Sequence, residues 1–204
     1  MAAKIHIWSD YVCPFCLIAD ELIERAVRDR TDLPDVEVVH HPHELRPHPT
    51  PTLRPEDPYL PDIWNRAVYP MARHHQVPMR LPTLSPQPYT ELAFRGAQYA
   101  QDHDRGHAYH RRLLTAFFRE DLDIGDRAVL ARLAGEVGLD AAEYAMALDD
   151  PAYAERHRAA LAESARLEIT VVPTIVIGER RIQGVATEGV IRRALGELDE
   201  AVVS

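Results

Sequence analysis

The stretch from Lys4 to Ala26, KIHIWSDYVCPFCLIADELIERA, decides the fold, because a strand pattern gives way to a helix pattern within it. The alternation of Ile5 and Ile7 predicts a short strand. Beyond the cysteine pair, apolar residues recur at three- and four-residue steps, which predicts an amphipathic helix. Pro14 suits the first helical position, where its fixed φ fits and its missing N–H loses no partner. We therefore expect Cys13 at or next to the helix N-cap, exposed at a strand-to-helix junction.

The chain has two cysteines, Cys13 and Cys16, which are one helical turn apart in a CPFC sequence. The free N–H groups of the first turn and the positive end of the helix dipole favour the thiolate of Cys13. A thiolate attacks disulfides, and Cys16 can then resolve the mixed disulfide. The pattern predicts thiol–disulfide exchange, with Cys13 as the exposed nucleophile and Cys16 as the more buried resolving thiol. Phe15, between them, offers no positive charge to the thiolate.

Three other interpretations of the cysteine pair compete with the redox one. A CxxC can be half of a zinc site, but zinc takes four ligands and histidines would have to supply the rest. A structural disulfide is disfavoured because nothing marks the chain as secreted. Two unreactive core cysteines fit poorly at a proline-led helix start. The redox interpretation is favoured, and we expect neither a metal nor an organic cofactor.

Composition limits the class of protein and its partners. The 204 residues are 46% hydrophobic, enough for one core with an insertion. With 32 acidic and 23 basic residues, nucleic acid and anionic membranes are disfavoured as main partners. No stretch approaches the length of a membrane span, and Met1 to Lys4 leads into the first strand without a secretory signal. We therefore expect a cytoplasmic protein.

The segment after the first helix completes a βαβ unit. Val36 to His40 alternates as a second strand, which should pair in parallel with the first. Residues 41–61 carry seven prolines in a polar run and predict an irregular crossing segment. Four histidines fall in or next to it: His40, His41, His43 and His48. Without helical spacing or carboxylate partners, we interpret them as part of a solvated loop and not as a metal site.

Residues 62–168 show a helical pattern throughout, with proline-rich breaks. Pro70 predicts a kink in the first of these helices, Asp126 and Asp140 predict N-caps, and Pro151 predicts the start of the last helix. We expect an all-helical insertion of about five elements over this range, between residues 1–61 and 169–204.

The last segment returns to strands. Thr170–Gly178 and Arg180–Val185 predict two strands joined by a turn, and Thr187 predicts the cap of a final helix. Pro173 falls just before the strand Thr174 to Ile177, where a proline must lie on an edge or at a strand start. The order of elements predicts an α/β protein with a thioredoxin fold, a mixed four-stranded sheet flanked by helices, interrupted by the helical insertion.

Four segments carry a family resemblance: IWSDYVCPFC, VVHHPHELRP, FFREDLDIGD, and VVPTIVIG with its following QG hairpin. Together they resemble the FrnE-like branch of the DsbA-like oxidoreductases over almost the whole chain. The resemblance implies a thioredoxin-fold dithiol–disulfide oxidoreductase, with Cys13 as nucleophile and Cys16 as resolving thiol. It also implies a cis-proline at Pro173 beside them. The same resemblance assigns active-site support to Pro14 and Phe15, and substrate binding to Val172 and Thr174.

The chain departs from this family at several positions. Leu17 and Asp20 stand where family members commonly carry an aromatic residue and a lysine, and the second cysteine pair of some relatives is absent. Phe15 replaces the histidine of periplasmic DsbA, and this replacement implies a less oxidising cysteine pair. The chain is also similar, more weakly, to the 2-hydroxychromene-2-carboxylate isomerases and kappa-class glutathione transferases. Those enzymes carry a serine where Cys13 stands. Expected partners are thiol- or disulfide-bearing proteins or small molecules, with glutathione a candidate co-substrate; the oligomeric state stays open, a homodimer included.

Overall fold

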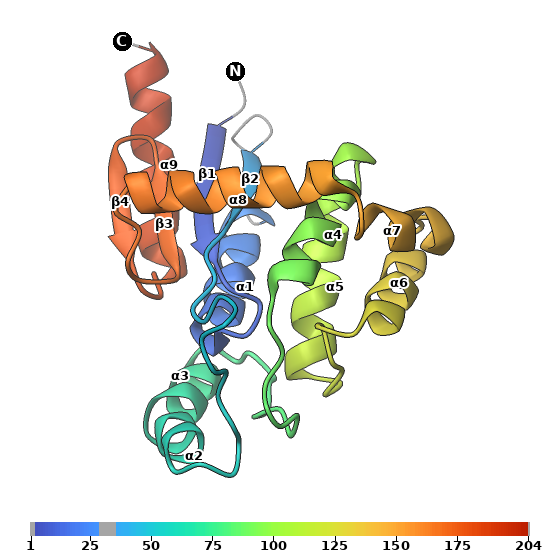
Figure 1. Ribbon diagram of the computed structural model, residues 1–204. Helices are drawn as coiled ribbons and strands as arrows, with labels where there is room; N and C mark the ends of the chain where they lie inside the picture. The colour runs from blue at the N-terminus through green and yellow to red at the C-terminus, as the bar shows by residue number, and fades with distance from the viewer. Residues whose placement is uncertain (1–2, 29–35, 204) are drawn as a thin grey trace.

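The computed structural model describes residues 3–28 and 36–203, and a four-stranded mixed sheet lies at its centre (Figure 1). The spatial order of the strands is β2-β1-β3-β4. Strand β1 pairs in parallel with β2 and antiparallel with β3, and β3 pairs antiparallel with β4. The strands are β1 (Ala3–Ser9), β2 (Val36–Pro42), β3 (Thr174–Ile177) and β4 (Arg180–Gln183). This confirms the predicted thioredoxin-fold sheet.

Three helices come from the segments near the two ends of the chain, including the helix that precedes β3. Helix α1 (Pro14–Arg28) connects β1 to β2 and packs against the last helix, α9 (Glu188–Val203). Helix α8 (Pro151–Arg166) runs across the front of the sheet in Figure 1 and contacts β2. The central strand β1 is buried at Ile5 and Ile7, as its apolar alternation predicts.

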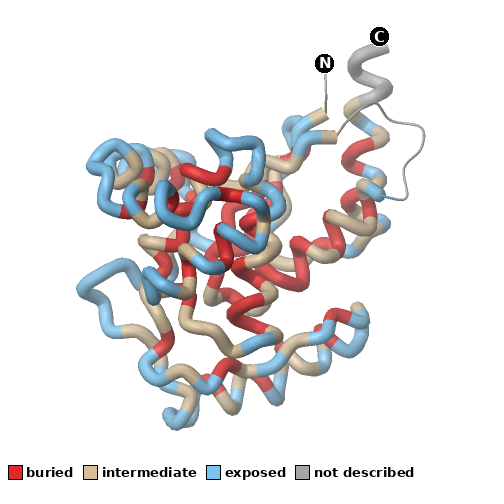
Figure 2. The backbone as a smooth tube through the Cα atoms, turned by 90° about the vertical axis from the view of Figure 1, so that its right-hand side faces the viewer, coloured by how far each residue is buried: buried red, intermediate tan, exposed pale blue. Residues whose placement is uncertain are grey.

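The remaining helices fill the interval between β2 and α8 and form the predicted helical insertion. Figure 2 shows that the buried positions gather in the interior, where these helices meet the sheet, and that the outer loops are exposed. One continuous hydrophobic core joins strand β1 to this region. The helices are α2 (Tyr59–Ile63), the π-helical turn η1 (Trp64–Val68), α3 (Tyr69–His74), α4 (Glu91–Asp102), α5 (Gly106–Phe118), α6 (Arg127–Glu136) and α7 (Ala141–Ala147).

Local chemistry explains how several helices begin and bend. The carboxylate of Asp126 accepts the N–H of Val129 at 2.9 Å, which caps α6 as predicted. The bend predicted at Pro70 takes the form of the π-helical turn before it. Pro70 has no N–H to donate to a carbonyl in the preceding turn, and the N–H of Tyr69 bonds instead to the carbonyl of Trp64, five residues earlier.

Strand β2 differs from the prediction at its end. It extends to Pro42, because Ser9 of β1 continues the parallel pairing to that residue, so His41 lies in the sheet and not in the irregular segment. Strand β3 spans Thr174–Ile177, as predicted, and its pairing with β1 begins at Thr174, whose partner is Trp8. The boundaries proposed at residues 61 and 168 for the insertion stay predictions.

Within residues 3–28 and 36–203, none of the helices combines the length and the apolar content that crossing a bilayer requires.

Candidate dithiol active site

The two cysteines lie at the junction between β1 and α1. Helix α1 begins at Pro14, so Cys13 occupies the position immediately before it, as predicted. The N–H of Cys13 donates to the carbonyl of Asp10 at 3.1 Å, and the N–H of Cys16 donates to the carbonyl of Cys13 at 3.0 Å. These two bonds fix the turn and place both thiols at the amino end of the helix.

The prediction that Cys13 is exposed is wrong. Cys13 is 4% exposed and Cys16 is 1% exposed, and both belong to a small apolar cluster separate from the main core. The covering group is the bend before β3, whose Val172 carbonyl lies 3.8 Å from the Cys13 sulfur and accepts its S–H. A segment from the other end of the chain therefore covers Cys13.

Cys13 is reached instead through a cavity of about 220 Å³. Cys13, Pro14 and Phe15 form one side of this cavity, and Val172 lies beside them. The facing wall is mostly apolar and comes from the segment after β2 and from the start of the insertion. It includes Leu45, Leu53, Tyr59, Leu60, Ile63 and Trp64. Cys16 is not among the lining residues. Only one of the two sulfurs thus faces the space that a substrate would enter.

The other predicted site residues lie behind this surface. The Val172–Pro173 peptide bond is cis, and the Pro173 carbonyl accepts the N–H of Gly184 at 2.8 Å. Thr174 is fully buried, and its hydroxyl donates to the carbonyl of Val171 at 2.5 Å. The structure therefore brings Val172 to the cavity but turns the Thr174 side chain inward. Substrate binding by Thr174 stays a prediction.

Burial also sets the electrostatics of Cys16. Together with the neighbouring Cys13 thiol, it raises the pKa of Cys16 well above its usual range. Cys16 therefore stays protonated at neutral pH until its proton has an acceptor. The order of attack, with Cys13 first, stays a prediction.

Asp10 is a site residue that the sequence analysis missed. Its carboxyl is buried, lines the same cavity as Cys13, and accepts the N–H of Leu45 at 2.7 Å. Burial raises its pKa to about 6, although hydrogen bonds from Leu45, Thr90 and Val12 oppose the rise. A carboxyl with this pKa can take up or release a proton near neutral pH. The signal in the sequence that could have identified Asp10 is its position three residues before Cys13, the candidate nucleophile.

Comparison with known proteins places this site in a family. The family model described as a DSBA-like thioredoxin domain matches residues 4–196. The uncharacterized protein YwbO of Bacillus subtilis (strain 168) is 41% identical over 97% of this chain and 98% of its own length.

Two solved structures share the architecture. The probable DsbA oxidoreductase SCO1869 from Streptomyces coelicolor superposes with a TM-score of 0.78 and 26% identity, over 96% of this chain and 89% of its own. A 2-hydroxychromene-2-carboxylate isomerase superposes with a TM-score of 0.76 over 98% of this chain and 99% of its own, but at 15% identity this likeness shows only the fold. Because the family model spans nearly the whole sequence, the chain belongs to the DsbA-like thioredoxin-domain family of thiol oxidoreductases.

Proposed function

We propose that the protein exchanges disulfides with thiol- or disulfide-bearing proteins or small molecules through the CPFC pair. The observation that carries this proposal is the unequal placement of the two sulfurs. Cys13 precedes the first residue of α1 and lines the cavity, whereas Cys16 lies behind it with a raised pKa. Two-step exchange requires one thiol that contacts the substrate and a second thiol that contacts only the first thiol.

The reaction proceeds in two displacements. The Cys13 thiolate attacks one sulfur of the substrate disulfide, forms a mixed disulfide and releases the other substrate sulfur as a thiolate. Cys16 then loses its proton and attacks the Cys13 sulfur, which releases the second substrate thiolate and leaves the Cys13–Cys16 disulfide. Two electrons pass from the protein to the substrate, and the reverse sequence oxidises a substrate dithiol.

Asp10 is our candidate for the acceptor of the Cys16 proton. Its carboxylate is close enough for its charge to oppose ionisation of Cys16, and its pKa of about 6 leaves it ionised at neutral pH. Asp10 can therefore accept a proton at neutral pH and release it again, which suits both directions of the exchange.

The cavity favours substrates that carry an apolar group next to the reacting sulfur. Its facing wall includes Leu53, Leu60 and Trp64, and burying an apolar group there gains about 25 cal/mol per Å². The Val172 carbonyl is positioned to accept an N–H from an extended substrate peptide. We further propose glutathione as a co-substrate, action in the cytoplasm, and no requirement for a metal or organic cofactor in this reaction.

A second candidate function is a glutathione-dependent isomerase or transferase. The favouring observation is the largely apolar cavity of about 220 Å³, which suits a small apolar molecule held against a sulfur. In that chemistry glutathione supplies the attacking sulfur, so Cys16 would be dispensable.

The deciding experiment is equilibration of the pure protein against graded thiol–disulfide buffers, with Cys13→Ser and Cys16→Ser as matched variants. We expect a reversible two-electron transition between roughly −270 and −120 mV, lost in both variants, and a mixed disulfide that accumulates in Cys16→Ser. If no Cys13–Cys16 disulfide forms in oxidising buffer, the exchange function is refuted. Turnover of a small electrophile with glutathione, unchanged in Cys16→Ser, would establish the isomerase instead.

A further inference from the structure

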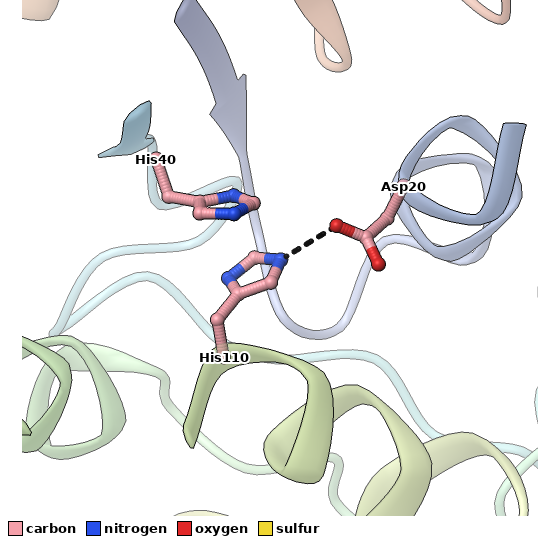
Figure 3. Close-up of side chains that lie close together, drawn as sticks. All are labelled: Asp20, His40 and His110. Carbon is pink, nitrogen blue, oxygen red and sulfur yellow. Dashed lines mark ion pairs between the residues drawn. The ribbon is translucent and has the colours of Figure 1, made fainter. Parts of the chain in front are cut away.

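Three metal-ligating side chains from distant parts of the sequence converge in the interior (Figure 3). Asp20 comes from α1, His40 from β2 and His110 from α5. One potential ligand atom of each lies within 4.8 Å of those of the other two. The cluster includes no cysteine, so its chemistry is separable from that of the dithiol.

His40 is the member whose environment points to a missing ligand. Both of its ring nitrogens are shielded from solvent, and neither has a hydrogen-bond partner among the described residues. Its ring stacks on that of His110 with the centroids 3.6 Å apart, as Figure 3 shows. A buried polar group without a partner carries a desolvation cost of roughly 1–3 kcal/mol.

Asp20 and His110 already have the spacing of neighbouring ligands. Their Oδ1 and Nε2 atoms are 3.2 Å apart. Ligand bonds of about 2.0–2.2 Å at tetrahedral angles place two ligand atoms about 3.4 Å apart, so an ion could bind both with little movement. A metal ion would replace this direct contact between the carboxyl and the ring.

The groups around the ligands are those that orient them in metal sites. The Tyr11 hydroxyl lies 3.3 Å from Nδ1 of His110, which leaves Nε2 to face Asp20. The Arg111 guanidinium donates to Oδ2 of Asp20 at 3.2 Å, which leaves Oδ1 for an ion. Such outer contacts hold a ligating ring or carboxylate in place.

A small cavity borders the cluster on the side of α5. Its volume is about 90 Å³, and Tyr11, His40, His107 and His110 are among its lining residues. This space is large enough for water, so a bound ion would have a free coordination position. Three protein ligands and one free position characterise open zinc sites.

We propose that Asp20, His40 and His110 bind a divalent transition-metal ion of the zinc class, with a fourth position open to this cavity. Two imidazoles and one carboxylate suit zinc and its neighbours better than they suit magnesium or calcium. From sequence, the histidines at and after the end of the second strand have neither helical spacing nor a carboxylate partner, so a metal site was not expected there. The fold supplies that partner from α1.

The test is zinc titration of the full chain carrying Cys13→Ser and Cys16→Ser, so that the thiols cannot contribute. We expect one zinc ion per chain by calorimetry, and a cobalt-substituted protein whose absorption lacks sulfur-to-cobalt charge transfer. His40→Ala should weaken zinc binding by more than about 100-fold, beyond the roughly 10- to 100-fold that the loss of an outer contact costs. This variant removes no hydrogen bond recorded among the described residues, so it should fold.

The matched control is His48→Ala, which removes an exposed histidine of the same region. It should leave zinc affinity unchanged, and Asp20→Asn should weaken it as His40→Ala does. A thiol-free protein that binds no zinc, or that binds it equally well in His40→Ala, overturns the proposal. Zinc bound only when the thiols are present overturns it too and assigns the metal to the dithiol.

Discussion

The sulfur of Cys13 and the carbonyl oxygen of Val172 lie 3.8 Å apart, although 159 residues separate them in the sequence. Helix α1 presents the first, and the bend before β3 presents the second. The contact covers the sulfur from one side and leaves it facing the apolar cavity. In the proposed function, a substrate would reach Cys13 through that cavity and meet the Val172 backbone there.

Labelling of the reduced protein should follow this difference in access. With less than one equivalent of a small uncharged alkylating reagent, we expect Cys13 to react before Cys16, because Cys16 does not line the cavity and its pKa is raised. Peptide mapping by mass spectrometry measures the ratio. In Cys13→Ser, labelling of Cys16 should stay slow. Equal labelling of both cysteines in the unmodified chain would contradict the assignment of roles.

The mouth of the cavity should control affinity without changing the redox pair. Leu45 is 47% exposed and lines the cavity, so Leu45→Glu should raise KM for an apolar disulfide substrate by about tenfold, the equivalent of 1.4 kcal/mol of lost apolar contact. The reduction potential should not move. The control is Met146→Glu on α7, where the native side chain is 67% exposed and does not line the cavity. A KM that rises equally in both variants would argue against this binding surface.

Much of the fold could be predicted because its signals are local. The helix start at Pro14, the cap at Asp126 and the alternation of β1 each depend on neighbours within a few residues. The family follows from the same features, since the CPFC turn and the segment around Pro173 keep their order along the chain. Assignment to the FrnE-like branch stays a prediction.

What could not be predicted depends on how distant segments approach one another. Cys13 is buried by the Val172 bend, and Asp10 has a raised pKa because the segment around Leu45 and the insertion close over it. The carboxylate near His40 belongs to Asp20 on α1, which in sequence is only a polar residue on an amphipathic helix. No spacing rule links these positions, because tertiary packing alone sets their distances.

Two glycines near α9 should respond oppositely to alanine. Gly178 has φ +58°, and a Cβ there would lie 2.5 Å from Cδ2 of Leu198. We expect Gly178→Ala to cost at least about 1–2 kcal/mol, from the left-handed conformation alone. Gly196, inside α9, has open space around its Cβ position, so Gly196→Ala should gain up to about 1 kcal/mol. Urea unfolding measures both. A destabilising Gly196→Ala would show that this face of α9 is covered.

Asp10 should make the stability of the protein depend on pH. Burial raises its pKa from 3.8 to about 6, so between these values the folded protein keeps a proton that the unfolded chain has released. The stabilisation is complete below about pH 4 and is lost as the pH rises through 6, a change of about 3 kcal/mol. Asp10→Asn removes this titration. We therefore compare the free energy of unfolding of the wild type with that of Asp10→Asn by urea unfolding at several pH values. The difference, wild type minus variant, should fall by about 3 kcal/mol between about pH 3 and 7. A constant difference would show that the carboxyl is already ionised in the folded protein at acidic pH, and would remove Asp10 as the proton acceptor for Cys16.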